Sequence, residues 1–407
     1  MNLLRDQLIS CLKEIFPARF HSRIFLVGGS VRDLLIGRSG ADLDLATALS
    51  PAEYGDCGFH LVSGRSTAPI WFRHIPELGT IEITPLSAVS DLTSDLTRRD
   101  FTVNAIALDM AGRLIDPLHG EPDLQQRLLR PSSSESFNYD PLRIFRALRF
   151  EADGWCLTAD AKGLIRGRNW NELLLKKPVE RFSREMLKAL AARQPDIFFQ
   201  RMLEFQVGTG FLPEIFRMPD IPAGPLIHHP EGDLFTHSRQ VLMRVAEQSG
   251  NPLARFCSFL HDLGKLSTDP TRYPKHHGHD QAGFDPARSL CDRLRLPASY
   301  RTALAWTSRL HGTLNLWQEL RDGTKIKTAE QALKSGLADI LPLVAAADKE
   351  GGSVPPGWRD AVRIAGLSNN ELGIETATLE NLPVNKRSGY IFQKKVEQFK
   401  NRYLMCA

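Results

Sequence analysis

The hydrophobic periodicity of this chain changes near residue 141, and this change constrains the fold more than any other feature. Before it, short β-rich runs alternate with helical ones, as in "RIFLVGG" (23–29), "DLDLAT" (42–47), "IWFRHI" (70–75) and "GTIEITPL" (79–86). From Pro141 onward almost every segment has helical period. We therefore predict an α+β fold, with a small mixed sheet and helices in a head, followed by an all-α body.

A chain of 407 residues is too long for a single hydrophobic core. The clearest linker-like break is "PSSSES" at 131–136, and proline and glycine gather again at 219–232 and 348–358. These breaks predict four parts: a head at 1–134, a helical neck at 135–212, a third helical domain at 213–365 and a helical tail at 366–407.

Composition indicates a cytoplasmic protein without a membrane partner. The formal net charge of +4 permits a nucleic-acid partner without requiring one. The six cysteines are scattered without a C-x-x-C pair, which predicts free, buried thiols in a reducing compartment. The first residues make a poor signal peptide, and no apolar run is long enough to span a bilayer. The oligomeric state cannot be predicted from the sequence.

Two carboxylates in "DLDLA" are the candidate catalytic residues. Alternation along a strand places Asp42 and Asp44 on the same side. Two hard oxygen ligands in that arrangement can share Mg²⁺ ions, which keep other positions for water and substrate phosphates. A pair of such metals would activate a 3′-hydroxyl and stabilise a leaving pyrophosphate. The alternative is an edge strand with solvated acidic residues.

The stretch "GGSVRD", upstream of these carboxylates, predicts a phosphate-binding turn. Gly28 and Gly29 let the backbone approach phosphates closely, and Arg32 can neutralise their charge. Asp33 is placed to orient Arg32. With this turn following a predicted strand, we favour a nucleotide site over the edge strand.

The motifs "GGSVRD…DLD", "RRDFTVNAIALD", "IDPLHGEPDLQQRLLR" and "DPLRIFRALRF" occur in this order. In this respect the chain resembles the bacterial tRNA nucleotidyltransferase and poly(A) polymerase family, the class that includes CCA-adding enzymes. The resemblance runs almost to the C-terminus. It implies a polymerase-β-like head that binds Mg²⁺, and a helical neck, body and tail. It also implies a tRNA 3′ end and CTP, with ATP as a further candidate, as partners.

The resemblance assigns roles in the head. Asp42 and Asp44 look like the metal ligands, and Glu82 in "IEIT" is a weaker candidate for a third carboxylate. An outward-facing strand residue is an equally good interpretation of Glu82. Asp100 resembles the residue that reads the ribose 2′-hydroxyl, with three polar residues nearby: Arg98, Arg99 and Asn104.

The segment "DPLRIFR" is similar to the part of the family that selects the base. Asp140 and Arg143 are three residues apart, so we expect one helix face to present both. A carboxylate accepts from the cytosine amino group, and a guanidinium donates to the ring edge. The resemblance implies that this pair acts as a protein template, with Arg146 in a triphosphate-binding or supporting role. The alternative is an exposed ion pair of little energetic value.

Two departures from the family pattern bear on the product. Tyr139 occupies the position where the family usually has Glu. Only fifteen residues, "ITPLSAVSDLTSDLT" (83–97), separate Glu82 from Arg98, and they include no Lys, Arg or Gly. This truncated loop resembles CC-adding members. We predict addition of two cytidines, with full CCA addition, A addition or poly(A) synthesis as alternatives. A further alternative is an RNA-binding scaffold whose head is inactive.

Eight of the twelve histidines lie between 228 and 311, within stretches such as "HHPEGDLFTH", "FLHDLGK" and "YPKHHGHDQAG". The order H…HD…D is similar to that of HD-domain metal-dependent phosphohydrolases. It implies four ligands for Mg²⁺, Ni²⁺ or Mn²⁺: His237, His261, Asp262 and Asp348. Lys265 would lie near a phosphate. The alternative is a decayed domain. Four further histidines either complete a second metal position or contact substrate: His276, His277, His279 and His311.

Overall fold

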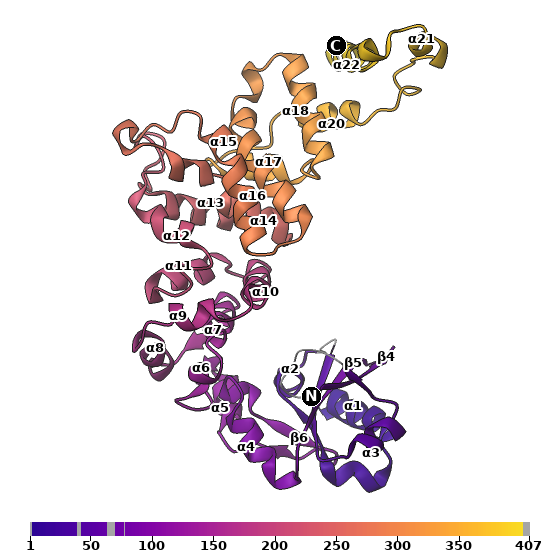
Figure 1. The fold of residues 1–407 in the computed structure, drawn as a ribbon, viewed down its shortest axis with the longest axis vertical. Helices are drawn as coiled ribbons and strands as arrows, with labels where there is room; N and C mark the ends of the chain where they lie inside the picture. Colours follow the sequence, from indigo (N-terminus) through magenta and orange to yellow (C-terminus); the bar gives the residue numbers. More distant parts are fainter. Residues whose placement is uncertain (1, 39–41, 63–69, 77, 402–407) are drawn as a thin grey trace. The chain divides into compact units, whose positions relative to one another are not determined.

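The computed structural model describes residues 2–38, 42–62, 70–76 and 78–401. The chain divides into two compact units, Met1–Trp170 and Asn171–Ala407, which Figure 1 draws from indigo to magenta and from magenta to yellow. The division falls inside the predicted neck at 135–212. The four-part organisation predicted from the sequence stays a prediction.

Unit 1 is built around one seven-stranded mixed sheet. Its strand order is β3-β4-β5-β2-β1-β6-β7, in which β2 and β5 pair in parallel and the other neighbours are antiparallel. The strands are β1 (Ile24–Val27), β2 (Asp42–Thr47), β3 (His60–Val62), β4 (Ile70–Ile75), β5 (Gly79–Pro85), β6 (Ala107–Asp109) and β7 (Leu114–Ile115). The four strands expected from residues 23–86 are therefore confirmed, and β3 was missed.

One face of the sheet is covered by three helices: α1 (Asn2–Ile15), α2 (Gly29–Leu35) and α3 (Pro51–Asp56). Alternate residues of β2 and β5, among them Leu43, Leu45, Ile81 and Ile83, pack against these helices in one core. The intervening residues of the same strands must point to the other face, because successive side chains of a strand alternate.

The other face is partly covered by the segment that follows β5. This segment forms a 3-10 turn, η2 (Val89–Asp91), and a short helix, α4 (Leu92–Thr97). Leu92 and Leu96 are buried against Phe25 and Val27 of β1. The short 83–97 segment is thus ordered and attached to the sheet by apolar contacts.

The remainder of unit 1 follows the predicted pattern of strand, turn and helix at 113–130. After β7 come α5 (Gly120–Gln125), β8 (Leu128–Leu129), α6 (Ser136–Tyr139), α7 (Arg143–Ala152), β9 (Cys156–Leu157) and α8 (Ala159–Arg166). β9 pairs with β8 and interrupts the helical pattern expected after Pro141.

Unit 2 is helical, and between residues 171 and 401 the structure has no named strand. Its helices are α9 (Asn171–Leu175), α10 (Val179–Leu190), α11 (Asp196–Phe205), α12 (Pro213–Arg217), α13 (Leu234–Gln248), α14 (Pro252–Leu260), α15 (His279–Ala282), α16 (Phe284–Arg293), α17 (Ala298–Asn315), α18 (Asp322–Lys334), α19 (Ile340–Ala347), α20 (Trp358–Ala365), α21 (Thr376–Glu380) and α22 (Val384–Asn401). Helices α13, α14, α17 and α19 pack on one another, and 3-10 turn η5 (Leu263–Ser267) follows α14. The all-α body is confirmed.

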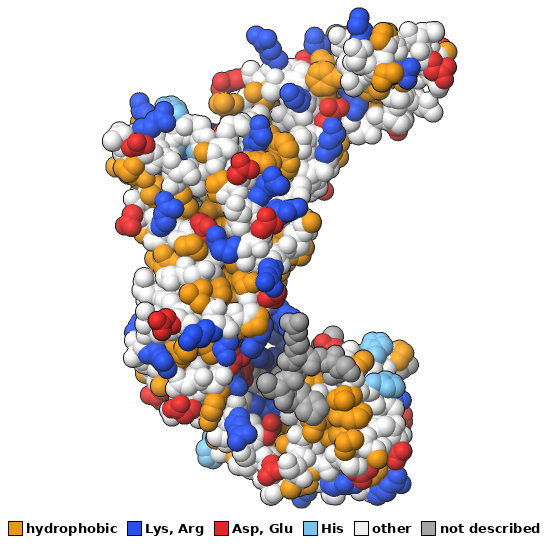
Figure 2. Space-filling view, in the orientation of Figure 1, with side chains coloured by type: hydrophobic (Ala, Val, Ile, Leu, Met, Phe, Trp, Pro, Cys, Tyr) orange, Lys and Arg blue, Asp and Glu red, His pale blue; other side chains and the backbone are white. Residues whose placement is uncertain are grey.

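Surface and thiol properties agree with the sequence in most respects. The cysteines among the described residues are free, but only Cys57, Cys257 and Cys291 are buried; Cys11 is half-buried, Cys156 is exposed, and Cys406 lies outside the described residues. Figure 2 shows Lys and Arg side chains along the drawn face of unit 2, interspersed with acidic ones. None of the helices in the described ranges has the length and apolar character needed to cross a bilayer.

Candidate functional site

Three carboxylates of unit 1 lie side by side on one face of the sheet. In the parallel pairing of β2 with β5, Asp44 is opposite Glu82 and Asp42 is opposite Thr80. Burial raises the pKa of Asp44, and Arg99 and Arg146 only partly offset this effect. Burial and then the charges of Asp44 and Asp42 raise the pKa of Glu82. Such a set of mutually repelling oxygens can hold divalent metal ions.

The predicted phosphate-binding turn lies directly against these carboxylates. Gly28 has a φ of 72°, a conformation that favours glycine, and α2 begins at Gly29. A Cβ on Gly28 would lie 2.7 Å from Arg99 Nη1 and 3.2 Å from Asp44 Oδ2. Ser30 Oγ accepts a bond of 2.9 Å from the Asp44 amide and donates one of 3.3 Å to the Asp42 carbonyl. Ser30, which the sequence reading did not single out, therefore ties the turn to β2.

Arg99 brings positive charge to the same place. Its guanidinium forms an ion pair of 2.9 Å with Asp95 of α4, and it is the group that lowers the pKa of Asp44 most strongly. Asp95 was not predicted to matter, but its i,i+4 spacing from Arg99 is a signal that the sequence contains. The short 83–97 segment thus contributes to the position of a site residue.

A buried polar network joins the other predicted nucleotide-binding residues. Arg32 pairs with Asp33 Oδ1 at 2.8 Å, as expected, and donates to Asn104 Oδ1 at 2.7 Å. Asn104 Nδ2 donates to Asp100 Oδ1 at 2.9 Å, and Asp100 Oδ2 pairs with Arg146 at 2.9 Å. Although burial raises the pKa of Asp100, Arg146 and the hydrogen bonds outweigh it, so the carboxyl stays ionised with a lowered pKa.

The expectation that one helix face presents Asp140 and Arg143 is wrong. Helix α7 begins at Arg143, and Asp140 precedes it with extended backbone (φ −150°, ψ 101°). The cause is Pro141, because a residue before proline is disfavoured in helical conformation. The Arg143 guanidinium donates to the carbonyl oxygens of Arg98 (2.6 Å) and Arg99 (3.0 Å), and so fixes the backbone next to Asp100.

A second cluster lies inside unit 2, where four predicted metal ligands come together from α13, the end of α14 and the end of α19. Asp348 Oδ1 lies 3.1 Å from His237 Nε2 and 3.2 Å from His261 Nε2. Asp262 Oδ2 lies 3.2 Å from His261 Nε2 and 3.6 Å from His237 Nε2. These four residues make up a group that could hold a metal ion, and we call it the first metal position.

Outer contacts orient these ligands. His237 Nδ1 is 2.6 Å from Glu231 Oε1, and His261 Nδ1 is 2.8 Å from the Ser258 carbonyl oxygen. With Nδ1 donating to an acceptor, each ring offers the lone pair of Nε2 to the cluster. Asn315 donates to the second oxygen of Asp348 at 2.7 Å. Glu231 and Asn315 were not predicted from the sequence, although Asn315 follows His311 by four residues on α17.

The electrostatics of this cluster favour a cation. Burial lowers the pKa of His261, but Asp262 and Asp348 outweigh it and raise that pKa to about 10. The pKa of Asp348 is well below its usual range, because bonds from His237 and His261 outweigh its burial. A divalent metal would replace the protons that these imidazoles otherwise hold.

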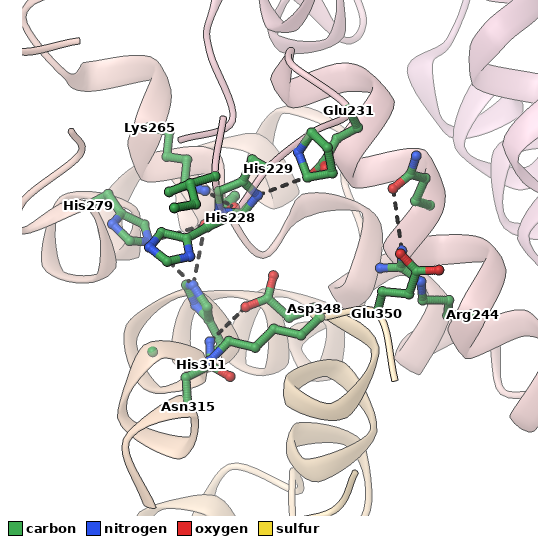
Figure 3. A pocket seen from close by; sticks show the side chains of 16 residues that line it. His228, His229, Glu231, Arg244, Lys265, His279, His311, Asn315, Asp348 and Glu350 are labelled. Atoms are coloured by element: carbon green, nitrogen blue, oxygen red, sulfur yellow. Dashed lines mark hydrogen bonds and ion pairs between the residues drawn. The ribbon is translucent and has the colours of Figure 1, made fainter. Parts of the chain in front are cut away.

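A cavity of about 790 Å³ opens over the cluster (Figure 3). Its lining includes the carboxylates Asp262 and Asp348 together with the cationic side chains of Arg244, Lys265 and Lys349. Lys265 lies 2.6 Å from Asp262 Oδ2 and donates to the Ala223 carbonyl oxygen at 2.7 Å. Lys265 lines the cavity, and its ammonium is engaged by these two protein groups.

The remaining histidines separate into two groups. His276 is buried, and both of its ring nitrogens are engaged, by Thr268 Oγ1 and by the Pro222 carbonyl oxygen, whereas His277 is exposed. His279 and His311 instead lie beside Asp262.

Comparison with known proteins identifies the family. The sequence model of the poly(A) polymerase head domain matches residues 24–60 and 74–130. The Multifunctional CCA protein of Thioalkalivibrio sulfidiphilus is 35% identical over 326 residues, covering 76% of this chain and 79% of that protein. The chain belongs to the tRNA nucleotidyltransferase family. A second relative, the Multifunctional CCA protein of Legionella pneumophila strain Lens, is 33% identical over 334 residues with the same coverage.

Solved structures of the family share the fold. A CCA-adding enzyme with CTP superposes with a TM-score of 0.63 at 20% identity, over 93% of this chain and 87% of that one. The Thermotoga maritima CCA-adding enzyme complexed with tRNA gives a TM-score of 0.61 at 19% identity, over 98% and 90%. The head and helical body predicted for a tRNA nucleotidyltransferase are therefore confirmed.

Asp42 and Asp44 of β2 are the expected metal ligands. Removal of either one should therefore reduce nucleotide incorporation. Metal stabilisation of the transition state is worth several kcal/mol, so Asp42→Ala or Asp44→Ala should lower the incorporation rate at least about a hundredfold. Exposed Asp56, at the end of α3, provides the control Asp56→Ala, which should keep the wild-type rate. Wild-type incorporation by the Asp42 or Asp44 variant, measured with labelled CTP and a tRNA transcript, would refute their assignment.

Proposed function

We propose that this tRNA nucleotidyltransferase adds two cytidines to the 3′ end of tRNA, without a nucleic-acid template, and then stops. The observation that carries the proposal is the set of carboxylates Asp42, Asp44 and Glu82 on one sheet face, next to a glycine turn and two arginines. The resemblance to the Multifunctional CCA proteins supports the part of this proposal that concerns nucleotide transfer to tRNA. Cytoplasmic location is part of the proposal.

The residues of the head have distinct roles in this reaction. When bound, Mg²⁺ at Asp42 and Asp44 would activate the tRNA 3′-hydroxyl and stabilise the pyrophosphate. Glycine at position 28 lets Arg99 and Asp44 approach the turn closely, because a Cβ there would lie 2.7 Å from Arg99 Nη1. Arg32 and Arg99 lie where they can neutralise phosphate oxygens.

Asp140 and Arg143 are proposed to select the base. Arg143 is held by three carbonyl oxygens, those of Arg98, Arg99 and Ser136, so its guanidinium is fixed in position before a nucleotide binds. Asp140 lies next to it, in the turn before α7. A carboxylate and a guanidinium together complement the amino group and the acceptors of cytosine.

The structure of segment 83–97 supports a stop after two cytidines. ATP presents its amino donor and ring acceptor in a different pattern, so the template pair must move to accept it. A segment that ends in a helix packed through Leu92 and Leu96, and that holds Arg99 through Asp95, resists such movement. Full CCA addition, A addition and poly(A) synthesis remain the alternatives within the same enzyme class.

Nucleotide incorporation on defined transcripts tests the function. Purified protein is incubated with tRNA transcripts that end at the discriminator base, after one cytidine or after two, with each labelled nucleoside triphosphate in turn. We expect CTP to be incorporated on the first two transcripts and no nucleotide on the third. Efficient ATP incorporation on the third would refute the stop after CC. The absence of any incorporation would favour the RNA-binding scaffold with an inactive head.

If Arg143 helps to select the base, its replacement should change the preference for CTP. Loss of one bidentate contact costs about 1–3 kcal/mol of discrimination, so Arg143→Ala should relax the preference for CTP over ATP, UTP and GTP roughly ten- to hundredfold. Arg143→Lys keeps the charge but loses the planar fork, and should relax it as well. Exposed Arg113 gives the control Arg113→Ala. An unchanged preference at a lower overall rate would assign Arg143 a structural role.

We propose that unit 2 carries a second activity, metal-dependent hydrolysis of phosphate esters. The supporting observation is the first metal position, in which two imidazoles and two carboxylates converge beneath a cavity with cationic side chains in its lining. A metal-bound water is the nucleophile that such sites supply.

Removal of a first-position ligand should abolish this hydrolysis and spare nucleotide addition, because the two sites are built from separate segments. With a 2′,3′-cyclic nucleotide and Mg²⁺, Mn²⁺ or Ni²⁺, His261→Ala or Asp262→Ala should lower the hydrolysis rate at least about a hundredfold, because loss of a direct ligand costs more than loss of an outer contact. His277→Ala, at an exposed histidine of the same region, is the matched control. If wild-type protein hydrolyses none of these substrates with any of the metals, the second activity is refuted for this substrate class.

A further inference from the structure

We propose that the 3′-terminal base of the tRNA stacks on Phe72 of β4, on the open part of the sheet face that carries the carboxylates. His60 and His74 lie beside Phe72, and we call these three residues the platform. The inference rests on the proposed function, because it takes Asp42 and Asp44 as the catalytic metal ligands. It adds a surface for the RNA end, to which none of the roles given above to the head residues belongs.

The register of the sheet places Phe72 in line with the carboxylates. Phe72 of β4 is opposite Glu82 of β5, and Glu82 is opposite Asp44 of β2. Side chains of directly opposed residues share one face of a sheet, so these three residues form a row across three strands. Two strand spacings, about 10 Å in total, separate the ends of the row. A metal ion and one nucleoside together span such a distance.

Two exposed histidines flank Phe72 on the same face. His60 of the edge strand β3 is opposite Phe72, and the two ring centroids are 6.4 Å apart with the planes at 61°. His74 follows Phe72 by two residues, and its Nδ1 lies 3.5 Å from Oγ1 of Thr80 on β5. Phenylalanine and histidine are among the side chains on which unpaired RNA bases stack. The open end of the sheet face thus presents rings beside the metal ligands.

The apolar side chains of β4 point away from the core instead of into it. Phe72 and Ile70 are each 37% exposed. Arg73 takes the alternate position, on the side of the core, where it donates to the Cys57 carbonyl oxygen at 2.6 Å. A strand with one buried face normally shows the reverse pattern, with polar residues outward. Apolar rings left in water favour a partner that covers them.

Reaction geometry gives this side of the carboxylates to the tRNA rather than to the nucleoside triphosphate. In the strand order, β1 lies on one side of β2, and β5 and β4 lie on the other. Gly28, which follows β1, and the adjacent Arg99 are the proposed triphosphate contacts. In an in-line displacement the attacking and leaving oxygens lie on opposite sides of the phosphorus. With pyrophosphate leaving on the side of Gly28, the 3′-hydroxyl approaches over β5, and its nucleoside lies over β4.

An aromatic platform suits an RNA end whose last base changes during the reaction. The terminal base is the discriminator before the first proposed addition and cytosine before the second. Every base has a π-face, so stacking on an aromatic ring accepts them all. Recognition by hydrogen bonds at this place would instead favour one base. The platform therefore holds the RNA end, and base selection stays with the site of the incoming nucleotide.

Photocrosslinking locates the RNA end directly. A tRNA transcript with 4-thiouridine as its 3′-terminal nucleotide is bound to the full chain without nucleoside triphosphates and irradiated, and the crosslinked peptide is identified by mass spectrometry. We expect crosslinks to β4, with a yield at least about fivefold lower for Phe72→Ala. Leu61→Ala is the matched control, because exposed Leu61 of β3 is opposite Trp71, which packs on the other face of the sheet.

Steady-state kinetics of CTP incorporation test the same surface with a second readout. Phe72→Ala should raise the KM for tRNA at least about fivefold through loss of one stack, and leave the KM for CTP unchanged. Phe72→Leu keeps apolar bulk but loses the ring, so it should behave like Phe72→Ala. Phe72→Tyr keeps the ring and should retain the wild-type KM for tRNA, as should Leu61→Ala.

The outcomes separate this inference from the proposed function. Wild-type incorporation of CTP, with crosslinks away from β4 and an unchanged KM for tRNA in Phe72→Ala, would overturn the platform and leave the function in place. Absence of incorporation would overturn the function, while the crosslink would still decide where the RNA end binds. A wild-type dimer that Phe72→Ala converts into a monomer, measured by light scattering, would assign this face to a second copy of the chain and overturn the platform.

Discussion

The parallel pairing of β2 with β5 is the constraint on which the head depends. This register places Asp44 beside Glu82 and directs both away from the core that Leu43 and Leu45 enter. A shift of one residue would bury the carboxylates and expose the leucines. The apolar core on one face thus fixes the carboxylates on the other, and the turn at Gly28 and the guanidinium of Arg99 are arranged around them.

The two units use the same physical principle with different ligands. Each places carboxylates close to one another, with Asp44 partly buried in the head and Asp262 fully buried in unit 2, and a bound cation would reduce the cost of that arrangement. The head uses oxygens alone, which suit Mg²⁺ and substrate phosphates. Unit 2 adds imidazoles held by outer contacts, as in the bond between His237 and Glu231, which suit transition metals as well. This difference in ligand chemistry agrees with the proposal that the two units catalyse different reactions.

The sequence predicted those parts of the sites that local pattern or family motif defines. Alternation was sufficient to place Asp42 and Asp44 on one face, because period two is a property of any strand. The position of Glu82 depended on how β5 pairs, which a local pattern cannot specify. The helical placement of Asp140 failed because Pro141 sets the residue before it in extended conformation. Glu231 was missed because its bond to His237 depends on how the turn before α13 folds back on that helix, which a local pattern does not specify.

The most direct measurement of the central claim is a crystal structure with Mn²⁺ and a non-hydrolysable CTP analogue, with manganese located by its anomalous scattering. The account predicts manganese bound to Asp42 and Asp44 and to the triphosphate, phosphate oxygens against the turn at Gly28, and the cytosine edge facing Asp140 and Arg143. A triphosphate bound elsewhere on the chain, or manganese density without contact to either aspartate of β2, would contradict it.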